Sequence, residues 1–276
     1  MNRELRVAAI NDLSGASRCS LTTALPIIAS MGINCCVMPT ALLSNHTGYD
    51  SYFFEDCTSQ MEEFSKSWQT MNLHFDCIFS GFLGSAKQID TVENFISHFA
   101  KKDTRILIDP VMGDNGEIYS TYTDEMCDKM KRLVKKADII TPNLTEACTL
   151  CDMDYVGEHP DDNTMNTICS KLCDMGAKSI ILTGCKCDNY ISNYVYSGGV
   201  GKKYSSELIP KYFTGTGDVF ASIICAMITK GESVFEAVEF ATDFVHRAAT
   251  YSYSIGITVN EGIAFEKFLG LLTARM

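Results

Sequence analysis

The sequence predicts an α/β protein in which a central, mostly parallel β-sheet is covered by helices on both faces. Short apolar runs alternate with segments of helical spacing along most of the 276 residues. The runs are β-branched and continuously apolar, which is typical of parallel strands that are buried on both faces. Neither a repeat nor a long linker interrupts this alternation, so we expect one domain over residues 1–276.

The strands and helices of this alternation are predicted in order along the first two thirds of the chain. The predicted strands are 5–10, 33–38, 75–79, 106–108, 138–140 and 179–182. Helical spacing marks the segments 18–31, 59–70, 87–101, 124–136 and 162–175. Strands that alternate with helices in this way form βαβ units, which place the strands side by side in parallel.

The last third of the chain departs from the alternation. Two runs, 190–196 and 203–208, are separated by a glycine-rich stretch, which indicates a hairpin and therefore an antiparallel edge of the sheet. An apolar stripe with helical period begins at Val219. Ser233 and Glu236 have the spacing of a capping box, so another helix is expected to begin there.

Composition narrows the class of protein. The net charge is −11, from 23 basic and 34 acidic residues, and such an acidic surface repels a phosphate backbone. We therefore expect no nucleic-acid partner, although backbone N–H groups can still bind a small anion locally. No apolar stretch is long enough for a membrane span and no signal peptide is evident, so the 13 cysteines are expected to be mostly buried free thiols of a cytoplasmic protein.

The sharpest motif is Gly215-Thr216-Gly217-Asp218, which directly precedes the apolar stripe and therefore lies at a helix N-terminus. Glycines let the backbone approach a ligand, and the free N–H groups of the first turn favour an anion. A carboxylate at this place fits a base that accepts a proton from an attacking hydroxyl while the amides hold a phosphoryl group. The alternative is a glycine-rich turn in which Asp218 only stabilises the helix.

Acidic and amide side chains follow two further strands. Asp109 and Asp114 come after the strand at 106–108, and Asn143 and Glu146 come after the strand at 138–140. Because ligands of parallel sheets bind beyond the carboxyl ends of the strands, these oxygens are candidates for Mg²⁺ or phosphate. The alternative for the second pair is that Asn143 caps a helix and Glu146 is an acid of its first turn.

Residues 40–57 are polar and aromatic and fit neither period, so we expect a flap or small lid beside the sheet. Within it, Ser44-Asn45-His46-Thr47-Gly48-Tyr49 is an unusual run of side chains that form hydrogen bonds or favour turns. For His46 considered alone, a structural role in the loop competes with a role in binding.

Together these motifs resemble the ribokinase superfamily and, within it, the pyridoxal and pyridoxamine kinases. The resemblance runs in order through Asn11 and Asp12, residues 44–49, 80–85, 109–114 and 141–146, and Gly215–Asp218. The run at 44–49 is specific for vitamin B6 kinases, whereas the Gly-x-Gly-Asp motif is specific only for the superfamily. The resemblance implies a ribokinase-like fold with a small β-flap and transfer of phosphate from ATP to the 5′-hydroxymethyl group of pyridoxal, pyridoxine or pyridoxamine.

The resemblance also implies roles for individual residues, together with Mg²⁺, a monovalent cation such as K⁺, and a homodimer. Asp218 matches the catalytic base, and Gly215, Thr216 and Gly217 match the anion hole. The other matches are Asp109, Thr141, Asn143, Glu146, Thr183 and Gly184 around ATP, Asp109, Asp114 and Glu146 around the metal, and Ser44, His46 and Thr47 in the flap over the vitamin. Asn11 stands where many members carry a Ser that hydrogen-bonds the substrate ring, and Phe82 stands where some members carry Tyr; Asn11 can still donate a hydrogen bond and Phe82 can still stack.

Three other functions compete with this interpretation. A hydroxymethylpyrimidine kinase of thiamine synthesis shares the fold, the Asp-Pro-Val-Met string and a hydroxymethyl-bearing aromatic substrate. A non-catalytic vitamin- or nucleotide-binding protein would have no reason to retain Asp218. A nicotinamide-dependent oxidoreductase is disfavoured because Phe220 replaces the third glycine of the Gly-x-Gly-x-x-Gly fingerprint.

Overall fold

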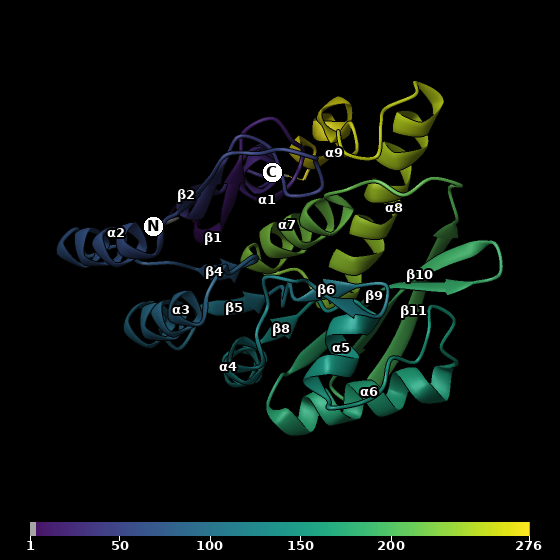
Figure 1. The fold of residues 1–276 in the computed structure, drawn as a ribbon, viewed down its shortest axis with the longest axis horizontal. Helices are drawn as coiled ribbons and strands as arrows, with labels where there is room; N and C mark the ends of the chain where they lie inside the picture. Colours follow the sequence, from purple (N-terminus) through teal and green to yellow (C-terminus); the bar gives the residue numbers. More distant parts are fainter. Residues whose placement is uncertain (1–3, 276) are drawn as a thin grey trace.

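The computed structural model describes residues 4–275, and a nine-stranded β-sheet passes through its centre (Figure 1). The strands of this sheet follow the order β11-β10-β9-β8-β5-β4-β1-β2-β3. The five neighbouring pairs from β9 to β2 are parallel, whereas β3, β10 and β11 run antiparallel to their neighbours. The strand bounds are β1 Arg6–Ser14, β2 Asn34–Leu43, β3 Phe54–Asp56, β4 Cys77–Ser80, β5 Arg105–Ile108, β8 Ile139–Ile140, β9 Ser179–Cys187, β10 Tyr190–Ser197 and β11 Val200–Glu207.

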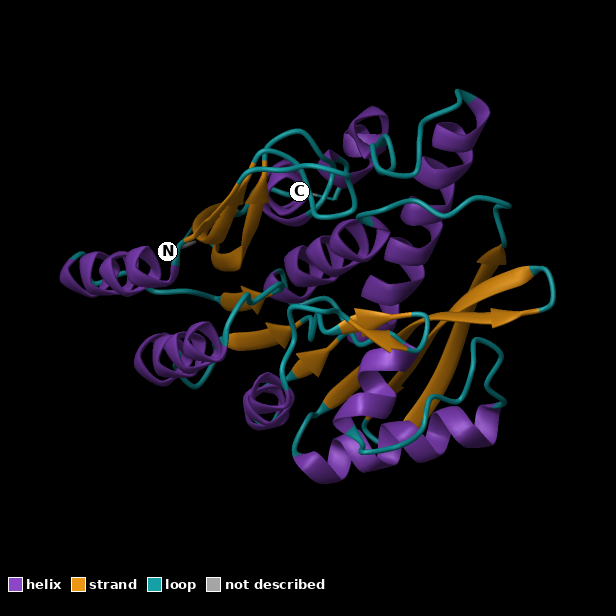
Figure 2. Ribbon diagram, in the orientation of Figure 1, coloured by secondary structure: helices purple, strands orange, loops and turns teal. Residues whose placement is uncertain are grey.

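Helices cover both faces of the sheet, as Figure 2 shows. One face packs against α1 (Ser20–Ser30), α7 (Thr216–Thr229) and α8 (Val234–Ser254), with the short η1 (Phe265–Phe268) and α9 (Leu269–Thr273) beside them. The other face packs against α2 (Thr58–Thr70), α3 (Ala86–Phe99), α4 (Asp124–Val134), α5 (Leu144–Leu150) and α6 (Asp162–Met175). Alternate side chains of β1 divide between the two cores, because Val7 and Ala9 point to the first and Ala8 and Ile10 to the second.

This architecture confirms the predicted fold class. Every predicted strand and helix is present, and the predicted hairpin β10–β11 forms an antiparallel end of the sheet. In the segment 40–57, the end of β2 pairs with β1 on one side and with the short β3 on the other, and the loop between β2 and β3 forms the tip of the flap. The capping box of Ser233 and Glu236 opens α8, with both of its reciprocal hydrogen bonds formed.

Several short elements differ from the prediction. A small separate hairpin is formed by β6 (Gly113–Asp114) and β7 (Glu117–Ile118). Its strands have two residues each, which is too short for a hydrophobic period to appear in the sequence. Helix α5 has only seven residues and was predicted only as a possible cap. Strand β9 does not end at Leu182, as predicted, but continues to Cys187, and its pairing with β10 shifts register between Ser192 and Tyr194.

The state of the cysteines and the lengths of the helices can be compared with the predictions from composition. All cysteines among residues 4–275 are free thiols, and Cys187 is the one that is exposed. Within the same residues, no helix combines the length and the apolar character that crossing a membrane requires.

Candidate active site

The carboxyl ends of β1 and β5, the start of α1 and the start of α7 meet at one edge of the sheet. Asp109 after β5 and Asp12 at the end of β1 both lie close enough to Asp218 of α7 to raise its pKa. Burial, followed by the nearby charges of Asp109 and Asp114, raises the pKa of Glu146 at the start of α5. The structure therefore brings together the acidic residues that the sequence places after separate strands, as the topology of a parallel sheet requires.

Asp218 lies in the first turn of α7 and is half-buried. Burial, followed by the nearby charges of Asp109 and Asp12, raises the pKa of its carboxyl group from 3.8 to about 7. The Nδ2 atom of Asn11 lies 3.4 Å from Oδ1 of Asp218, and the backbone N–H of Ser20 also faces this carboxyl group. A carboxyl group poised near neutral pH and oriented by two donors has the properties of a general base.

The turn before Asp218 leaves the N-terminus of α7 open. Gly215 adopts φ +78°, and a Cβ there would overlap the carbonyl oxygen of Arg18, so this position requires glycine. A Cβ at Gly217 would meet no atom within 4 Å, so this residue borders open space. No side chain of the described residues caps the helix at Gly215, and Thr216 Oγ1 turns back toward the carbonyl of Phe213. The first-turn N–H groups therefore remain available for an anion.

Asn11 and Phe82 are coupled by a hydrogen bond. The Oδ1 atom of Asn11 accepts from the backbone N–H of Phe82 at 2.8 Å and from that of Asp12 at 2.9 Å. Gly81 makes this approach possible, since a Cβ there would overlap the Asn11 side chain. These contacts fix the amide of Asn11, which is 2% exposed, so that its Nδ2 side points to Asp218.

Asp109 and Thr141 lie next to each other at the ends of neighbouring strands. Thr141 Oγ1 donates to Oδ1 of Asp109 over 2.9 Å. Burial raises the pKa of Asp109, and the hydrogen bond from Thr141 opposes this effect. Asp109 keeps its second carboxylate oxygen for another partner, as a metal or a bound water would need.

Glu146 and Asn143 form a capping box at the start of α5. Oε2 of Glu146 accepts from the N–H of Asn143 at 2.8 Å, and Oδ1 of Asn143 accepts from the N–H of Glu146 at 3.0 Å. The Oε1 atom of Glu146 accepts from the N–H of Met112, and Asn143 Nδ2 donates to the carbonyl of Gly113. The helix-cap interpretation of this pair is thus seen directly, and the contacts also fix the loop that carries Asp114.

Thr183 and Gly184 lie beside this cap. Thr183 bridges to Asn143 in parallel and donates its N–H to the carbonyl of Pro142 over 3.0 Å. Gly184 adopts φ +71° and is exposed where the register of β9 and β10 shifts. The shift turns this part of β9 out of the regular ladder at the carboxyl edge of the sheet.

The flap is attached to two other loops, the one before α1, where the N–H of His46 donates to Ser17 Oγ, and the one after α8. His46 Nε2 lies 2.9 Å from the carbonyl oxygen of Asn260, and Asn260 Nδ2 donates to the carbonyl of Gly48 over 3.0 Å. The N–H of Gly48 donates to His46 Nδ1, so the Nε2 atom carries the proton and donates to Asn260. The structural role of His46 is therefore seen, whereas Thr47 is exposed and Ser44 Oγ accepts from the N–H of Phe53 within the flap.

Three residues of this region escaped the sequence analysis as individual candidates: Asp12, Ser20 and Asn260. Asp12 accepts hydrogen bonds from the hydroxyl groups of Ser14 and Ser20. Its position directly after Asn11 at a strand end is the one signal in the sequence that indicates a role. Ser20 and Asn260 carry no recognisable motif, because their contacts join segments that are distant in the chain.

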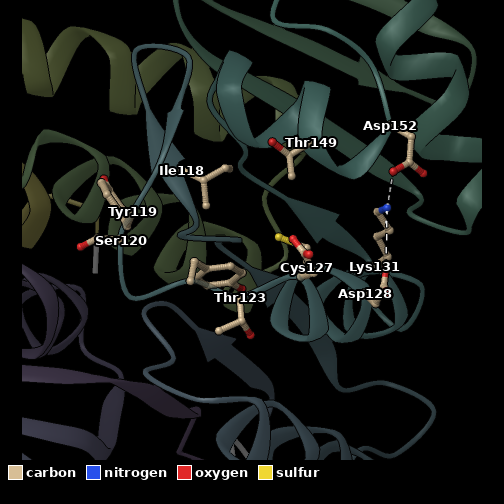
Figure 3. Close-up of a pocket in the computed structure, with 11 residues that line it drawn as sticks. Ile118, Tyr119, Ser120, Thr123, Cys127, Asp128, Lys131, Thr149 and Asp152 are labelled. Atoms are coloured by element: carbon tan, nitrogen blue, oxygen red, sulfur yellow. Dashed lines mark hydrogen bonds and ion pairs between the residues drawn. The ribbon is translucent and has the colours of Figure 1, made fainter.

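An open hollow of about 560 Å³ lies next to this edge, between β7, α4 and α5 (Figure 3). Figure 3 shows Tyr119 at one end and the ion pair of Lys131 with Asp152 at the other. None of the site residues predicted from the sequence lines it. Tyr119 lies between this hollow and the acidic residues of the candidate site: burial raises the pKa of its hydroxyl group most, and the nearby charges of Glu146 and Asp114 raise it further.

The comparison with known protein families agrees with this geometry. A family model described as phosphomethylpyrimidine kinase matches residues 24–262, most of the chain. The chain belongs to this family. It is therefore a kinase, and its fold and its family agree with the resemblance seen in the sequence.

Individual relatives of this kinase divide between two substrates. The hydroxymethylpyrimidine/phosphomethylpyrimidine kinase of Bacillus subtilis is 31% identical over 67% of this chain and 67% of its own length. A crystal structure described as a phosphomethylpyrimidine kinase from Bacteroides thetaiotaomicron is 38% identical, with a TM-score of 0.95 over 98% of this chain and 94% of that one. A second crystal form of the Bacteroides protein is described as containing pyridoxal. The pyridoxal kinase of Lactobacillus plantarum is 25% identical, with a TM-score of 0.91 over 98% of this chain and 97% of that one.

Proposed function

We propose that this kinase transfers the γ-phosphate of ATP to the 5′-hydroxymethyl group of pyridoxal, pyridoxine or pyridoxamine. The observation that carries the proposal is Asp218, a half-buried carboxyl group of raised pKa beside the uncapped N-terminus of α7. Asp218 accepts the proton of the attacking 5′-hydroxyl group, and the oxygen of that hydroxyl group forms a bond to the γ-phosphorus. The bond from the γ-phosphorus to the bridging oxygen of ADP breaks, and the N–H groups of Gly215, Thr216 and Gly217 stabilise the charge of the phosphoryl group in transit.

The nucleotide is assigned to the edge formed by β8, β9 and the start of α7. Thr141, Asn143, Thr183 and Gly184 follow one another along this edge through the contacts described above. Gly184 is exposed and carries no side chain, so a ligand can lie close to its backbone. The first turn of α7 then faces the terminal phosphate from the opposite side.

Mg²⁺ fits the donor set at this edge when it is bound together with ATP. The described residues contain no group of three or more side chains that would hold a metal by themselves. Mg²⁺ in kinases is usually held by one or two carboxylates plus phosphate oxygens and waters, and it neutralises charge on the phosphates. Asp109 is the best-placed carboxylate, because both oxygens of Asp114 already accept from Asn115 and both oxygens of Glu146 already accept backbone N–H groups.

The acceptor is assigned to the space between Asn11, Phe82 and the flap. Asn11 Nδ2 supplies a donor next to Asp218, Phe82 supplies a half-buried ring, and Ser44, His46 and Thr47 lie in the flap that borders the loop before α1. The pyridoxal in the related Bacteroides structure supports a vitamin B6 substrate. The exclusion of water by the flap would protect the phosphoryl group from hydrolysis.

Hydroxymethylpyrimidine is the second candidate acceptor. The family model and the Bacillus relative are both named for pyrimidine phosphorylation. Both acceptors carry a hydroxymethyl group on a nitrogen heterocycle, so Asp218 and the anion hole would act on either in the same way.

ADP release measured with pyridoxal, pyridoxine, pyridoxamine and hydroxymethylpyrimidine tests this proposal. We expect the highest kcat/KM with a B6 vitamer and loss of kcat by about 10²–10⁴-fold in the Asp218→Asn variant. A kcat/KM that is highest for hydroxymethylpyrimidine would assign the pyrimidine function instead. An Asp218→Asn variant that keeps wild-type kcat would contradict the role of Asp218 as base.

A further inference from the structure

Asp12 is a buried carboxylate whose one part in the phosphoryl transfer described above is to raise the pKa of Asp218. It is 7% exposed and lies at the end of β1, next to the candidate site. Its Oδ1 atom accepts from Ser20 Oγ at 2.5 Å, and its Oδ2 atom accepts from Ser14 Oγ at 2.7 Å. Both oxygens therefore already have donors from the protein, so the side chain acts on the surrounding chain and not on a ligand.

The hydrogen bond to Ser20 holds an unusual piece of backbone. Ser20 is the first residue of α1 and adopts φ +50°, a left-handed conformation that residues with a Cβ seldom adopt. Cys19, which precedes it at the N-cap position, makes no side-chain cap. The bond from the Ser20 hydroxyl to Asp12 is thus the side-chain contact that secures this conformation. The start of α1 packs against the start of α7, because a Cβ at Gly215 would meet Arg18 and Cys19, and this contact brings the backbone N–H of Ser20 near Asp218.

The backbone of Asp12 also acts on the other donor that faces Asp218. The N–H of Asp12 donates to Oδ1 of Asn11 over 2.9 Å, and this bond helps to direct Nδ2 of Asn11 toward Asp218. The two donors around the proposed base therefore share one neighbour. A substitution of the Asp12 side chain breaks the contact with Ser20 and leaves its backbone bond to Asn11 in place.

We propose that Asp12 is a positioning residue for phosphoryl transfer, which holds Ser20 so that the backbone N–H of Ser20 orients the carboxylate of Asp218 toward the acceptor. This inference rests on the proposed function of Asp218 as the base, and it applies to either candidate acceptor. A carboxylate without its second donor would rotate away from the attacking hydroxyl. Loss of such alignment lowers kcat while the affinity for substrates remains, because no contact with a ligand is removed.

The experiment measures kcat and KM with Mg-ATP and each of pyridoxal and hydroxymethylpyrimidine, using the complete chain. The variants are Asp12→Ala, Asp12→Asn, Ser20→Ala and Asp218→Asn, with Ser14→Ala as the matched control. Ser14 and Ser20 each donate one hydroxyl to Asp12, but only Ser20 carries a backbone N–H that faces Asp218. Melting temperatures of all variants show which of them are folded.

We expect Asp12→Ala and Ser20→Ala to lower kcat by about 10- to 100-fold with KM changed by less than about threefold. Asp12→Asn keeps an oxygen for Ser20 and should recover much of this loss, and Ser14→Ala should keep kcat within about twofold of wild type. In the double variant Asp12→Ala/Asp218→Asn, kcat should be no lower than in Asp218→Asn alone, because residues that act through one group are not additive. If Asp12→Ala does not fold, Ser20→Ala combined with Asp218→Asn gives the same comparison.

Three results would overturn the inference: wild-type kcat in Ser20→Ala, equal losses in Ser14→Ala and Ser20→Ala, or a multiplied loss in the double variant. These results differ from a failure of the proposed function. Wild-type kcat in Asp218→Asn, or no turnover of either acceptor by the wild type, would overturn the role of Asp218 and with it this inference. A damaged Asp218→Asn variant beside an undamaged Ser20→Ala variant would overturn only the role of Asp12.

Discussion

Burial and two neighbouring carboxylates raise the pKa of Asp218 to about 7, which has consequences for both rate and stability. A general base must be deprotonated, so kcat should rise with pH through about 7 and level off above it. A pH profile of kcat, measured at saturating substrates, checks this expectation. A profile that is flat from about pH 5 to about pH 8 would show that the rate-limiting step does not depend on this ionisation.

The same shift predicts how the stability of the Asp218→Asn variant depends on pH. Because the folded pKa of Asp218 lies above its ordinary value of 3.8, the folded state binds more protons than the unfolded state between these values. The contribution of Asp218 to the free energy of unfolding therefore falls as pH rises through this interval. Asparagine carries no charge and removes this loss of stability. The melting temperature of Asp218→Asn minus that of wild type should therefore increase from about pH 5 to about pH 8, by about 2 °C or more. A constant difference between the two proteins would contradict the raised pKa.

The two glycines of the proposed anion hole should respond differently to alanine. Gly215→Ala places a Cβ against the carbonyl of Arg18 at φ +78°, so we expect a loss of about 1–3 kcal/mol in the free energy of unfolding. Gly217→Ala meets open space inside a helix, where alanine stabilises by about 0.5–1 kcal/mol. Its Cβ would enter the space assigned to the phosphoryl group, so we expect a higher melting temperature and at least a tenfold lower kcat/KM for ATP, or about 1.4 kcal/mol. Wild-type kinetics in Gly217→Ala would show that the phosphoryl group does not bind next to Gly217.

At the scale of residues, the sequence indicated a site where several strands end but not how each side chain is used. Asp109 and Asp218 could be predicted because strand ends and helix starts meet at one edge of a parallel sheet. Asn11 was predicted to contact the substrate, but the sequence did not indicate that its Oδ1 atom accepts from the N–H groups of Asp12 and Phe82. Such bonds depend on loops that approach within hydrogen-bonding distance in space, and sequence spacing does not encode them.

At the scale of elements, the strands and helices with long hydrophobic periods were predictable, whereas short ones depended on tertiary contacts. Strand β8 has two residues and α5 has seven, and both are fixed by neighbours: β8 by pairing with β5 and β9, and α5 by the capping box of Asn143. The flap was predicted because residues 40–57 show neither the helical nor the strand period. Its strand β3 is held in place by pairing with β2. An isolated three-residue strand would not be stable without this partner.

The flap should become less mobile when both substrates are bound. The contacts of Asn260 with His46 and Gly48 attach it to the loop after α8, and these groups are only partly buried. We expect amide hydrogen exchange in residues 40–57 to slow when pyridoxal and a non-hydrolysable ATP analogue bind together, with exchange in α2 as the internal control. In Asn260→Ala, which loses the bond to Gly48, exchange in the free flap should be faster and KM for the acceptor higher. Exchange that ignores both ligands would make the segment an ordinary surface loop.

At the scale of the whole molecule, the site combines segments from both ends of the chain. The loop before α1 contacts the flap, because the N–H of His46 donates to Ser17 Oγ. Arg18 of the same loop forms an ion pair with Glu266 near the C-terminus. The N–H of Thr214 also donates to the carbonyl of Val259, which joins the glycine-rich loop before α7 to the loop that holds the flap. The parallel order of the central strands was predictable from βαβ alternation, but this return of the C-terminal segment was not, because no hydrophobic period marks it.

The net charge of −11 predicts how salt affects the binding of ATP. An acidic protein repels Mg-ATP at long range, and the Debye length shortens from about 30 Å at 0.01 M salt to about 8 Å at 0.15 M. Screening should therefore lower KM for ATP over this range. Choline chloride changes ionic strength without supplying a small monovalent cation, so a parallel titration with KCl isolates any specific effect of K⁺. Equal curves would mean that screening alone acts and would remove K⁺ from the proposed cofactors, whereas a KM that rises in both salts would show that local positive groups at the site outweigh the charge of the whole protein.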